Sequence, residues 1–290
     1  SKSIDNIYCE SCWTIFEHLS QFMMTTKNYR QGINYFNNGY IPQKSGKYFY
    51  WKAKLYVLLN EPDSALIQTS ESIRIAQLQN IPEVVVAAYN QHGLIAKSLG
   101  LYDDAIVAFS EAIKLVDSST LDEKRFGYLI GNLGSCYYQK GAFDEAYNCL
   151  QIDANKSKER SQDRGSYLNA EIMLAKIDLK RKDHKLALHR LDRLMEMYES
   201  FLIPFQKLSV LELYMQAFKL SGNKSKYESY LNQWITLTKT NTESSINDNK
   251  KLIEAYSTNS IEQTILQLET EKKLLNQELI TNKLLNEQLA

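Results

Sequence analysis

The stretch Tyr89–Ala112 reads YNQHGLIAKSLGLYDDAIVAFSEA, and the stretch Ile130–Leu150 reads IGNLGSCYYQKGAFDEAYNCL. Each begins with a bulky residue, has a glycine four residues later, and continues with a second glycine, an aromatic residue and an alanine. This order predicts a helix, a tight turn and a second helix, with small residues where the two helices cross. Because one helical hairpin cannot bury its apolar face alone, we expect copies of it to stack into a solenoid.

The spacing of the pattern predicts how many hairpins stack. The alanine of the second helix recurs at intervals of 40, 41 and 41 residues, at Ala65, Ala105, Ala146 and Ala187. Weaker copies lie upstream, around Gly32, and downstream, around Tyr227. The sequence therefore predicts about six hairpins, of which the outer two are degenerate, as terminal repeats commonly are.

The small residues of the pattern have two different roles. Gly93 and Gly134 lack a Cβ, so they should let the first helix approach its neighbour closely. Gly100 and Gly141 should lie in the turn, where a helix often ends in a left-handed residue. Acidic residues follow each turn and should favour the positive end of the next helix dipole: Asp103, Asp104, Asp144 and Glu145.

These residues resemble the motif of the tetratricopeptide repeat (TPR) family, which combines a bulky residue, Leu-Gly, Tyr, Gly, an aromatic residue, Ala, Phe and Ala at fixed offsets. The first stretch supplies Tyr89, Gly93, Gly100, Tyr102, Ala105, Phe109 and Ala112, with His92 and Ala96 in place of the Leu and the Tyr. The second supplies Ile130, Leu133, Gly134, Tyr137, Gly141, Phe143, Ala146 and Leu150. The resemblance covers about residues 13–240 and implies an all-α, TPR-like solenoid. Because the repeats exceed the usual length of about 34 residues, we expect extended helices or linkers.

Composition agrees with an almost entirely helical chain. There are 4 Pro and 11 Gly in 290 residues, 44% of residues are hydrophobic, and no alternating strand pattern persists. We therefore expect essentially no sheet. With 34 basic and 34 acidic residues, the chain as a whole has no electrostatic basis for binding nucleic acid.

Few residues suggest catalysis or metal binding. Cys9 and Cys12 form a close pair, for which helix-packing thiols, a redox or disulfide pair and half of a metal site are all open readings. Cys136 and Cys149 are 13 residues apart, on the two helices of one hairpin, and are expected to be buried thiols. The 4 histidines form no metal-binding pair, and no phosphate-binding or nucleophile motif is present. We predict a protein that is not an enzyme and needs no cofactor or metal.

The resemblance implies that the first helices line a concave groove. Carrying the family pattern over gives the inward-facing candidates Tyr50, Lys54, Asn90, Lys97, Tyr128, Ser135, Tyr138, Asn169, Lys176, Lys180, Gln216 and Lys219. Lysine, tyrosine and asparagine side chains suit an extended peptide or protein segment, or an anionic ligand. The alternative is a solvated groove wall. The carboxylate clamp of the family is not matched at the required offsets.

The C-terminal part follows another pattern. We expect the TPR-like domain at residues 1–240, a polar connection at 241–260, and a long helix at 261–290. Heptad positions in this helix are held by Ile261, Ile265, Leu268, Leu275 and Leu279, with Asn282 interrupting. Three readings stay open: a dimerising coiled-coil stalk, a helix that folds back on the solenoid, and a helix that frays.

A TPR array followed by a charged helix resembles the sensor region of membrane-tethered regulators of Bacteroidota. That resemblance implies a segment of a longer protein, with the repeats on the periplasmic face and a membrane span and output module outside this sequence. The output would be a DNA-binding domain or a histidine kinase. A constitutive cytoplasmic scaffold is the main alternative. An intracellular peptide-pheromone receptor is a third reading, although such receptors usually place the output domain before the repeats.

Overall fold

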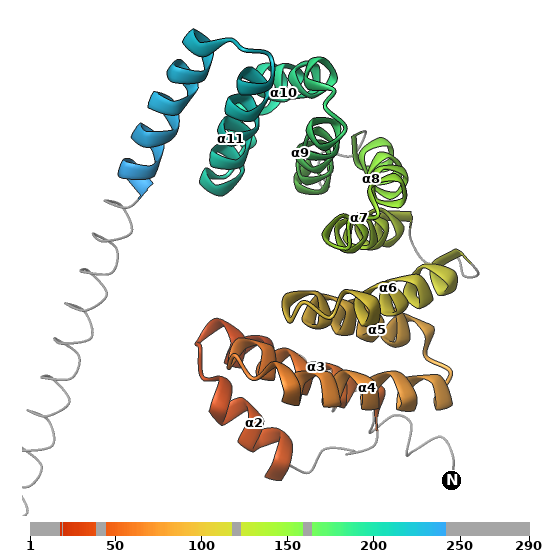
Figure 1. Ribbon diagram of the computed structural model, residues 1–290. Coiled ribbons are helices and arrows are strands. Elements are labelled where there is room, and N and C mark those ends of the chain that lie inside the picture. Colours follow the sequence, from red (N-terminus) through yellow and green to blue (C-terminus); the bar gives the residue numbers. More distant parts are fainter. Residues whose placement is uncertain (1–17, 19, 39–44, 118–122, 159–163, 242–290) are drawn as a thin grey trace, which may run out of the picture. The chain divides into compact units, whose positions relative to one another are not determined.

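The computed structural model describes residues 18, 20–38, 45–117, 123–158 and 164–241, and these are mostly helical (Figure 1). The chain divides into two compact units, Ser1–Tyr227 and Glu228–Ala290. Within the first unit, residues 20–25 are helical and precede α2 (Tyr29–Asn38). Four complete hairpins follow: α3 (Gly46–Leu58) with α4 (Pro62–Leu78), α5 (Pro82–Ser98) with α6 (Tyr102–Asp117), α7 (Glu123–Gln139) with α8 (Phe143–Lys158), and α9 (Arg164–Lys180) with α10 (His184–Tyr198).

The last repeat begins after a short 3-10 helix, η2 (Glu199–Phe201), and its first helix is α11 (Pro204–Leu220). Residues 224–241 are helical; of these, 228–241 belong to the second unit. Residues 20–25 with α2 form a further hairpin before these four, and α11 is followed along the chain by the helical residues 224–241. The all-α solenoid is therefore confirmed, and the described residues contain no strand.

Each turn inside a hairpin contains a residue with positive φ. Gly100, Gly141 and Gly222 have φ of 77°, 78° and 71°, as the sequence predicted for the first two. Asn60 and Lys182 adopt the same conformation in their hairpins, with φ of 59° and 62°. The left-handed residue lets the chain reverse and lets the last carbonyls of the first helix accept hydrogen bonds, because the amides that follow turn back toward them. In the α5–α6 turn, for example, the amide of Leu101 donates to the carbonyl of Ala96 at 2.9 Å.

The contacts between helices define two layers. Each helix packs on the next one along the chain, from α3 to α11. The first helices of successive hairpins also touch one another: α3 with α5, α5 with α7, α7 with α9, and α9 with α11. These helices therefore form the closely spaced inner layer, and α4, α6, α8 and α10 cover it from the other side.

The small residues allow this packing. The repeat-marking alanines are completely buried: Ala65, Ala105, Ala146 and Ala187. A Cβ built on Gly93 would lie 2.8 Å from the ring of Phe109, and one on Gly134 would lie 2.9 Å from Cγ of Leu150. Both glycines thus permit close helix crossing, as expected, and a larger side chain would displace a core residue.

Several predictions fall on residues outside those described. They concern Cys9, Cys12, the polar connection and the candidate stalk residues Ile261, Ile265, Leu268, Leu275 and Leu279. Cys136 and Cys149 are free thiols, the first buried and the second half-buried, as expected. Within the described ranges, no helix is both long and apolar enough to cross a bilayer.

Candidate functional site

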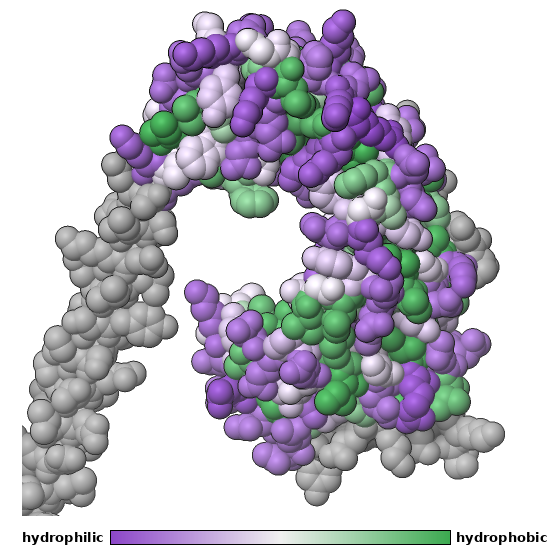
Figure 2. All heavy atoms as spheres, in the orientation of Figure 1, coloured by the Kyte–Doolittle hydropathy of each residue, from purple (hydrophilic) through white to green (hydrophobic). Residues whose placement is uncertain are grey.

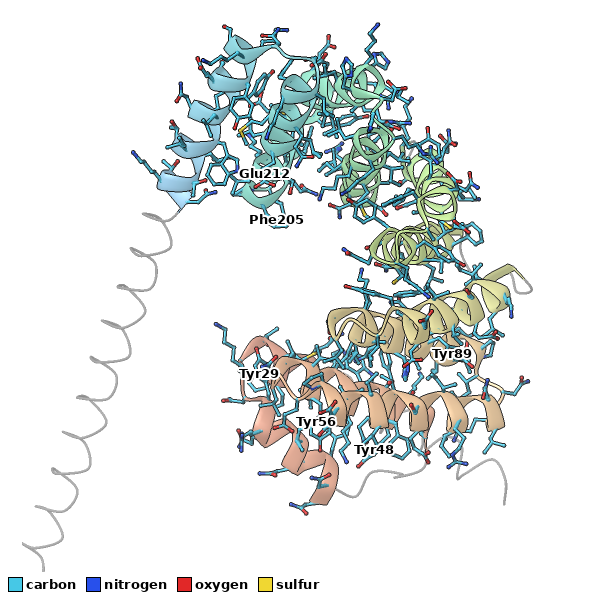
Figure 3. The ribbon with its side chains drawn as sticks, viewed as in Figure 1. Tyr29, Tyr48, Tyr56, Tyr89, Phe205 and Glu212 are labelled. Atoms are coloured by element: carbon cyan, nitrogen blue, oxygen red, sulfur yellow. The ribbon has the colours of Figure 1, made fainter. Side chains whose placement is uncertain are left out.

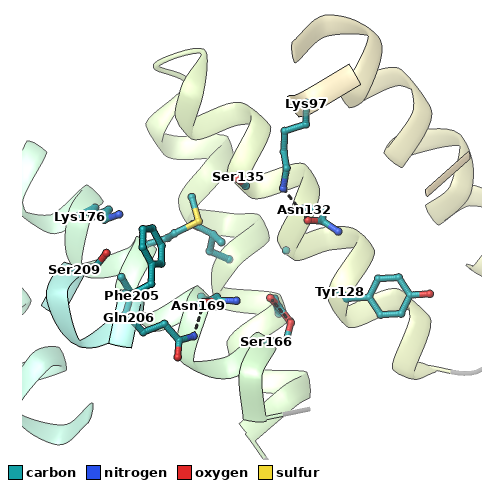
Figure 4. Close-up of a pocket in the computed structure, with 16 residues that line it drawn as sticks. Lys97, Tyr128, Asn132, Ser135, Ser166, Asn169, Lys176, Phe205, Gln206 and Ser209 are labelled. Atoms are coloured by element: carbon teal, nitrogen blue, oxygen red, sulfur yellow. Dashed lines mark hydrogen bonds between the residues drawn. The ribbon is translucent and has the colours of Figure 1, made fainter. Parts of the chain in front are cut away.

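Two hollows open on the inner layer of the first unit. The central hollow has a volume of about 480 Å³ and is formed mainly by α7, α9 and the start of α11, with Lys97 reaching in from α5 (Figure 4). The C-terminal hollow has a volume of about 770 Å³ and is formed by the ends of α7, α9 and α11. Lys176 borders both hollows, so we treat them as one inner groove. Figure 2 shows hydrophilic and hydrophobic side chains next to one another on the side of the molecule that it displays.

Nine of the twelve groove residues expected from the sequence lie in these hollows. The central hollow contains Lys97, Tyr128, Ser135, Asn169 and Lys176. The C-terminal hollow contains Tyr138, Lys176, Lys180, Gln216 and Lys219. Their role in binding a ligand stays a prediction.

The remaining three candidates line neither hollow. The Lys54 ammonium lies over the rings of Tyr50 and Trp51, at 5.0 Å and 4.5 Å from their centres. The amide oxygen of Asn90 is buried and has no hydrogen-bond partner. These three side chains therefore lie outside both hollows, and their role in binding stays a prediction.

Lys97 places a partly buried ammonium group in the central hollow. Its Nζ donates a hydrogen bond to Oδ1 of Asn132 on α7 at 3.0 Å. Burial lowers the pKa of Lys97, because a desolvated ammonium loses hydration, and the Cys136 thiol nearby opposes this shift. Burial also raises the pKa of the Cys136 thiol to about 11, so this cysteine is a protonated packing group.

A buried carboxylate forms part of the floor of the central hollow. Asp153, on α8, is 3% exposed, and its two carboxylate oxygens accept from the Ser166 hydroxyl at 2.9 Å and 3.0 Å. A Cβ on Gly131 would lie only 2.2 Å from Oδ2 of Asp153. Gly131 on α7 therefore leaves the space through which this carboxylate reaches the hollow.

Phe205 supplies an apolar wall. It follows Pro204 in the first turn of α11, lines the central hollow and is 74% exposed; Figure 3 shows it projecting from this end of α11. The next residue, Gln206, fixes this end of α11. Its Oε1 accepts from the amide of Ile203 at 3.1 Å, and its Nε2 donates to Oδ1 of Asn169 at 2.7 Å.

Sequence reasoning missed Phe205, Gln206, Asn132 and Asp153. Asn132 and Asp153 lie outside the inward positions that the family pattern supplies. Phe205 and Gln206 lie before the part of α11 to which the family pattern was applied. A Pro-Phe pair at a helix start is the signal that could have drawn attention to them, but it does not say whether the ring is buried.

The C-terminal hollow is rich in ammonium groups. Lys176, Lys180 and Lys219 line it together with a single carboxylate, Glu212, and Lys180, Glu212 and Lys219 are exposed. None of the three lysines forms an ion pair with a residue that the structure describes. The hollow therefore offers positive charge to a ligand.

The chemical groups of the groove are those of a recognition surface. In the part of the chain that the structure describes, no cluster of histidine, cysteine, aspartate or glutamate could hold a metal ion. The free cysteines Cys136 and Cys149 have raised pKa values because of burial, which suppresses the thiolate that a nucleophile would need. The groove itself offers amides, hydroxyls, ammonium groups, two carboxylates and an exposed aromatic ring, which can recognise ligands by contact.

Comparison with known proteins supports the fold. Residues 86–115 match the family model "Tetratricopeptide repeat", which covers the α5–α6 hairpin. A search of curated proteins found no match. The chain therefore contains a tetratricopeptide repeat within a TPR solenoid.

The solved structures that resemble the chain are TPR proteins or share this architecture at low sequence identity. A signal transduction ATPase with numerous domains (STAND), with a TPR sensor, from Pyrococcus horikoshii has a TM-score of 0.67 and 17% identity, over 82% of this chain and 38% of that one. PilF of Pseudomonas aeruginosa has a TM-score of 0.60 and 15% identity, over 79% and 93% of the two chains. BtubC from P. vanneervenii has a TM-score of 0.60 and 14% identity, over 78% and 92%. At these identities the likeness establishes the fold alone.

Proposed function

We propose that this tetratricopeptide-repeat chain is an interaction module that binds an extended segment of another protein in its inner groove. One observation carries the proposal: the inner groove brings lysine ammonium groups, side-chain hydroxyl and amide groups, and the exposed side chain of Phe205 together on one layer. Such a surface provides hydrogen bonds for a peptide backbone and an apolar anchor for a side chain. TPR domains in general bind peptides or proteins, in agreement with this reading.

The test is a selection from a random peptide library displayed on phage, with the full chain as bait. Selected peptides are then measured against Phe205→Ala and Lys176→Glu, both on the inner groove. Matched controls are Ile67→Ala and Lys185→Glu, whose exposed side chains lie on the second helices α4 and α10. We expect groove variants to weaken binding and the controls to leave it unchanged. Peptides that bind all variants equally well would contradict the proposal.

We further propose that the module belongs to a larger regulatory protein and that ligand binding is relayed through the C-terminal helix at 261–290. The heptad pattern of that helix and the TPR sensor in the similar STAND protein support this reading. Binding that favours one arrangement of the hairpins would change the pairing of a helix that continues from them. In such a regulator, the repeats would lie on the periplasmic face of a membrane; a cytoplasmic scaffold is the alternative.

Light scattering of the full chain beside a variant ending at Ser260 tests the relay. A dimer that is lost on truncation would support a dimeric stalk formed by Leu268, Leu275 and their neighbours. A second variant, Leu268→Glu with Leu275→Glu, should then also be monomeric. A monomer in every case would remove the stalk and favour the scaffold.

A further inference from the structure

The inner groove has an asymmetry in charge that goes beyond a general peptide site. Four lysines line the two hollows, Lys97, Lys176, Lys180 and Lys219, against the two carboxylates Asp153 and Glu212. Asp153 is almost completely buried and accepts hydrogen bonds from Ser166; even when it is counted with Glu212, the lining holds two more lysines than carboxylates. This excess contrasts with the zero formal charge of the whole chain and makes the groove a local positive region.

The positive groups lie on both sides of an apolar surface. Phe205 and Met173 line the central hollow from α11 and α9. Figure 4 shows Lys97 reaching in from the α5 side, with Phe205 and Lys176 on the opposite side. Beyond Lys176, the C-terminal hollow adds Lys180 and Lys219. A segment along the groove would thus pass an ammonium group, an apolar wall and then further ammonium groups.

The backbone that carries this wall is held in position before any ligand binds. Gln206 joins the start of α11 to Asn169 of α9, and it also closes the first turn of α11 through Ile203. Phe205 is the residue directly before Gln206, so its backbone is fixed although its ring is 74% exposed. An exposed aromatic ring on a fixed backbone resembles the anchors that dominate peptide binding.

Because the groove offers this order of groups, we propose that its ligand is an extended protein segment with an apolar side chain flanked on both sides by acidic residues. The apolar side chain enters the central hollow against Phe205. The acidic residues pair with Lys97 on one side and with Lys176, Lys180 and Lys219 on the other. The low polarity around Lys97 strengthens such a pairing, since a carboxylate offsets the loss of hydration that burial imposes on its ammonium group. This inference rests on the proposed function and specifies its ligand.

The test measures fluorescence anisotropy of labelled peptides with blocked ends against the full chain. The probe is EDEFEDE, and the matched peptides are EDEGEDE without the apolar side chain, SNSFSNS without charge, and KRKFKRK with reversed charge. We expect EDEFEDE to bind most tightly and KRKFKRK not to bind. Raising the salt concentration from about 0.05 M to about 0.5 M should weaken EDEFEDE far more than SNSFSNS, because salt screens exposed charges.

Variants assign the two parts of the site. Lys176→Glu should weaken EDEFEDE about tenfold, since reversal replaces attraction by repulsion, and should leave SNSFSNS unchanged. Phe205→Ala should weaken EDEFEDE about tenfold, to the level of EDEGEDE. The controls Lys185→Glu and Ile67→Ala should change neither peptide. Circular dichroism of each variant shows whether it keeps the native helix content.

The outcomes separate this inference from the proposed function. If library peptides bind the groove but are neutral or basic, or EDEFEDE binds no better than SNSFSNS, the acidic ligand is wrong and the interaction module stands. If no library peptide depends on Phe205 or Lys176, both proposals fail. If a single-stranded DNA competes with EDEFEDE and itself loses affinity in Lys176→Glu, the groove takes a polyanion rather than an acidic protein segment, and the inference is overturned.

Discussion

The α5–α6 and α9–α10 hairpins share the repeat pattern, but the residues around the helix crossing are apolar in the first and charged in the second. Ala105 and Ala187 mark equivalent positions in them, and both are completely buried. In the first hairpin the crossing is sealed by apolar residues, among them Phe109 and Ala96. In the second, the residues 82 positions after Tyr89 and Ala96 are Glu171 and Asp178, both buried carboxylates.

An arginine of α10 holds these two carboxylates together. Arg190 donates from Nη1 to Glu171 at 3.0 Å and from Nε to Asp178 at 2.7 Å, and from Nη2 to the Tyr147 hydroxyl at 2.8 Å. Burial raises the pKa of Asp178, and the hydrogen bond from Arg190 opposes this rise. The repeat therefore requires small residues where its two helices cross. The positions around the crossing can be apolar or charged, provided that every buried charge is paired.

The largest expected effect comes from breaking the ionic hairpin. Arg190→Leu leaves Asp178 buried without its arginine partner and leaves Glu171 paired with Arg193 alone, which should lower the free energy of unfolding by about 3–5 kcal/mol. Urea unfolding followed by circular dichroism measures it.

The control for this prediction replaces all three groups, Glu171→Leu, Asp178→Leu and Arg190→Leu. Because no uncompensated charge then remains in the trio, the triple variant should be more stable than Arg190→Leu alone. If the triple variant is the less stable of the two, the network contributes net stability and the comparison drawn above is wrong.

The apolar hairpin should respond to volume instead of charge. In Gly93→Ala the new Cβ would meet the buried ring of Phe109 at 2.8 Å, so the variant should lose about 1–3 kcal/mol of unfolding free energy. Gly165→Ala is the matched control: no atom lies within 4 Å of its Cβ, and alanine in a helix is favoured over glycine by up to about 1 kcal/mol. Equal effects of the two substitutions would show that helix propensity, and not the crossing, governs Gly93.

A smaller effect should appear as a pH dependence at the edge of the apolar hairpin. His92 occupies the place of the motif leucine, its Nδ1 lies 2.9 Å from the Thr69 hydroxyl oxygen, and burial lowers its pKa below the ordinary 6.5, with Asp104 opposing. The folded state thus favours neutral imidazole. Its contribution to stability is present above pH 6.5 and is lost as the pH falls through the lowered value.

The substitution His92→Leu removes this titration and restores the motif residue. Between pH 7.5 and pH 5, about one unit above and about one and a half units below the ordinary pKa, its unfolding free energy should decline less than that of the parent chain. The remaining histidines are common to both proteins, so the difference between the two curves isolates His92. Parallel curves would contradict the prediction.

Most of the fold could be predicted from the sequence because it depends on short local patterns. Gly100 and Gly141 predict the turns, and the spacing of the alanines predicts where the two helices of each hairpin cross. The left-handed Lys182 carries no such signal, since lysine seldom adopts positive φ, and the hairpin was found only through Ala187. The burial of Glu171 and Asp178 could not be predicted from the sequence either, because it depends on their ion pairs with Arg190 of the neighbouring helix.

The groove was predictable in outline and not in composition. The family pattern placed nine residues that line the hollows, because inward positions repeat with the hairpin. Phe205 depends on where α11 begins, and Asp153 depends on the missing side chain of Gly131, so neither follows from periodicity. Tyr50, Lys54 and Asn90 share the predicted spacing, yet their side chains have other surroundings: the Lys54 ammonium stacks on aromatic rings, and the amide oxygen of Asn90 is buried.

The smallest expected effect on stability separates the groove from both hairpin cores. Lys176→Glu and Lys180→Glu change side chains that form no ion pair with any described residue, so each should alter the free energy of unfolding by no more than about 0.5 kcal/mol. The same urea experiment measures this, with Lys185→Glu of α10 as the control. A loss comparable to that of Arg190→Leu would mean that these lysines belong to the ionic packing and are not available to a ligand. If the free energy of unfolding hardly changes while peptide binding weakens, the lysines of the inner groove serve recognition and not stability. Charges between the two helix layers would then be tolerated only where they are paired.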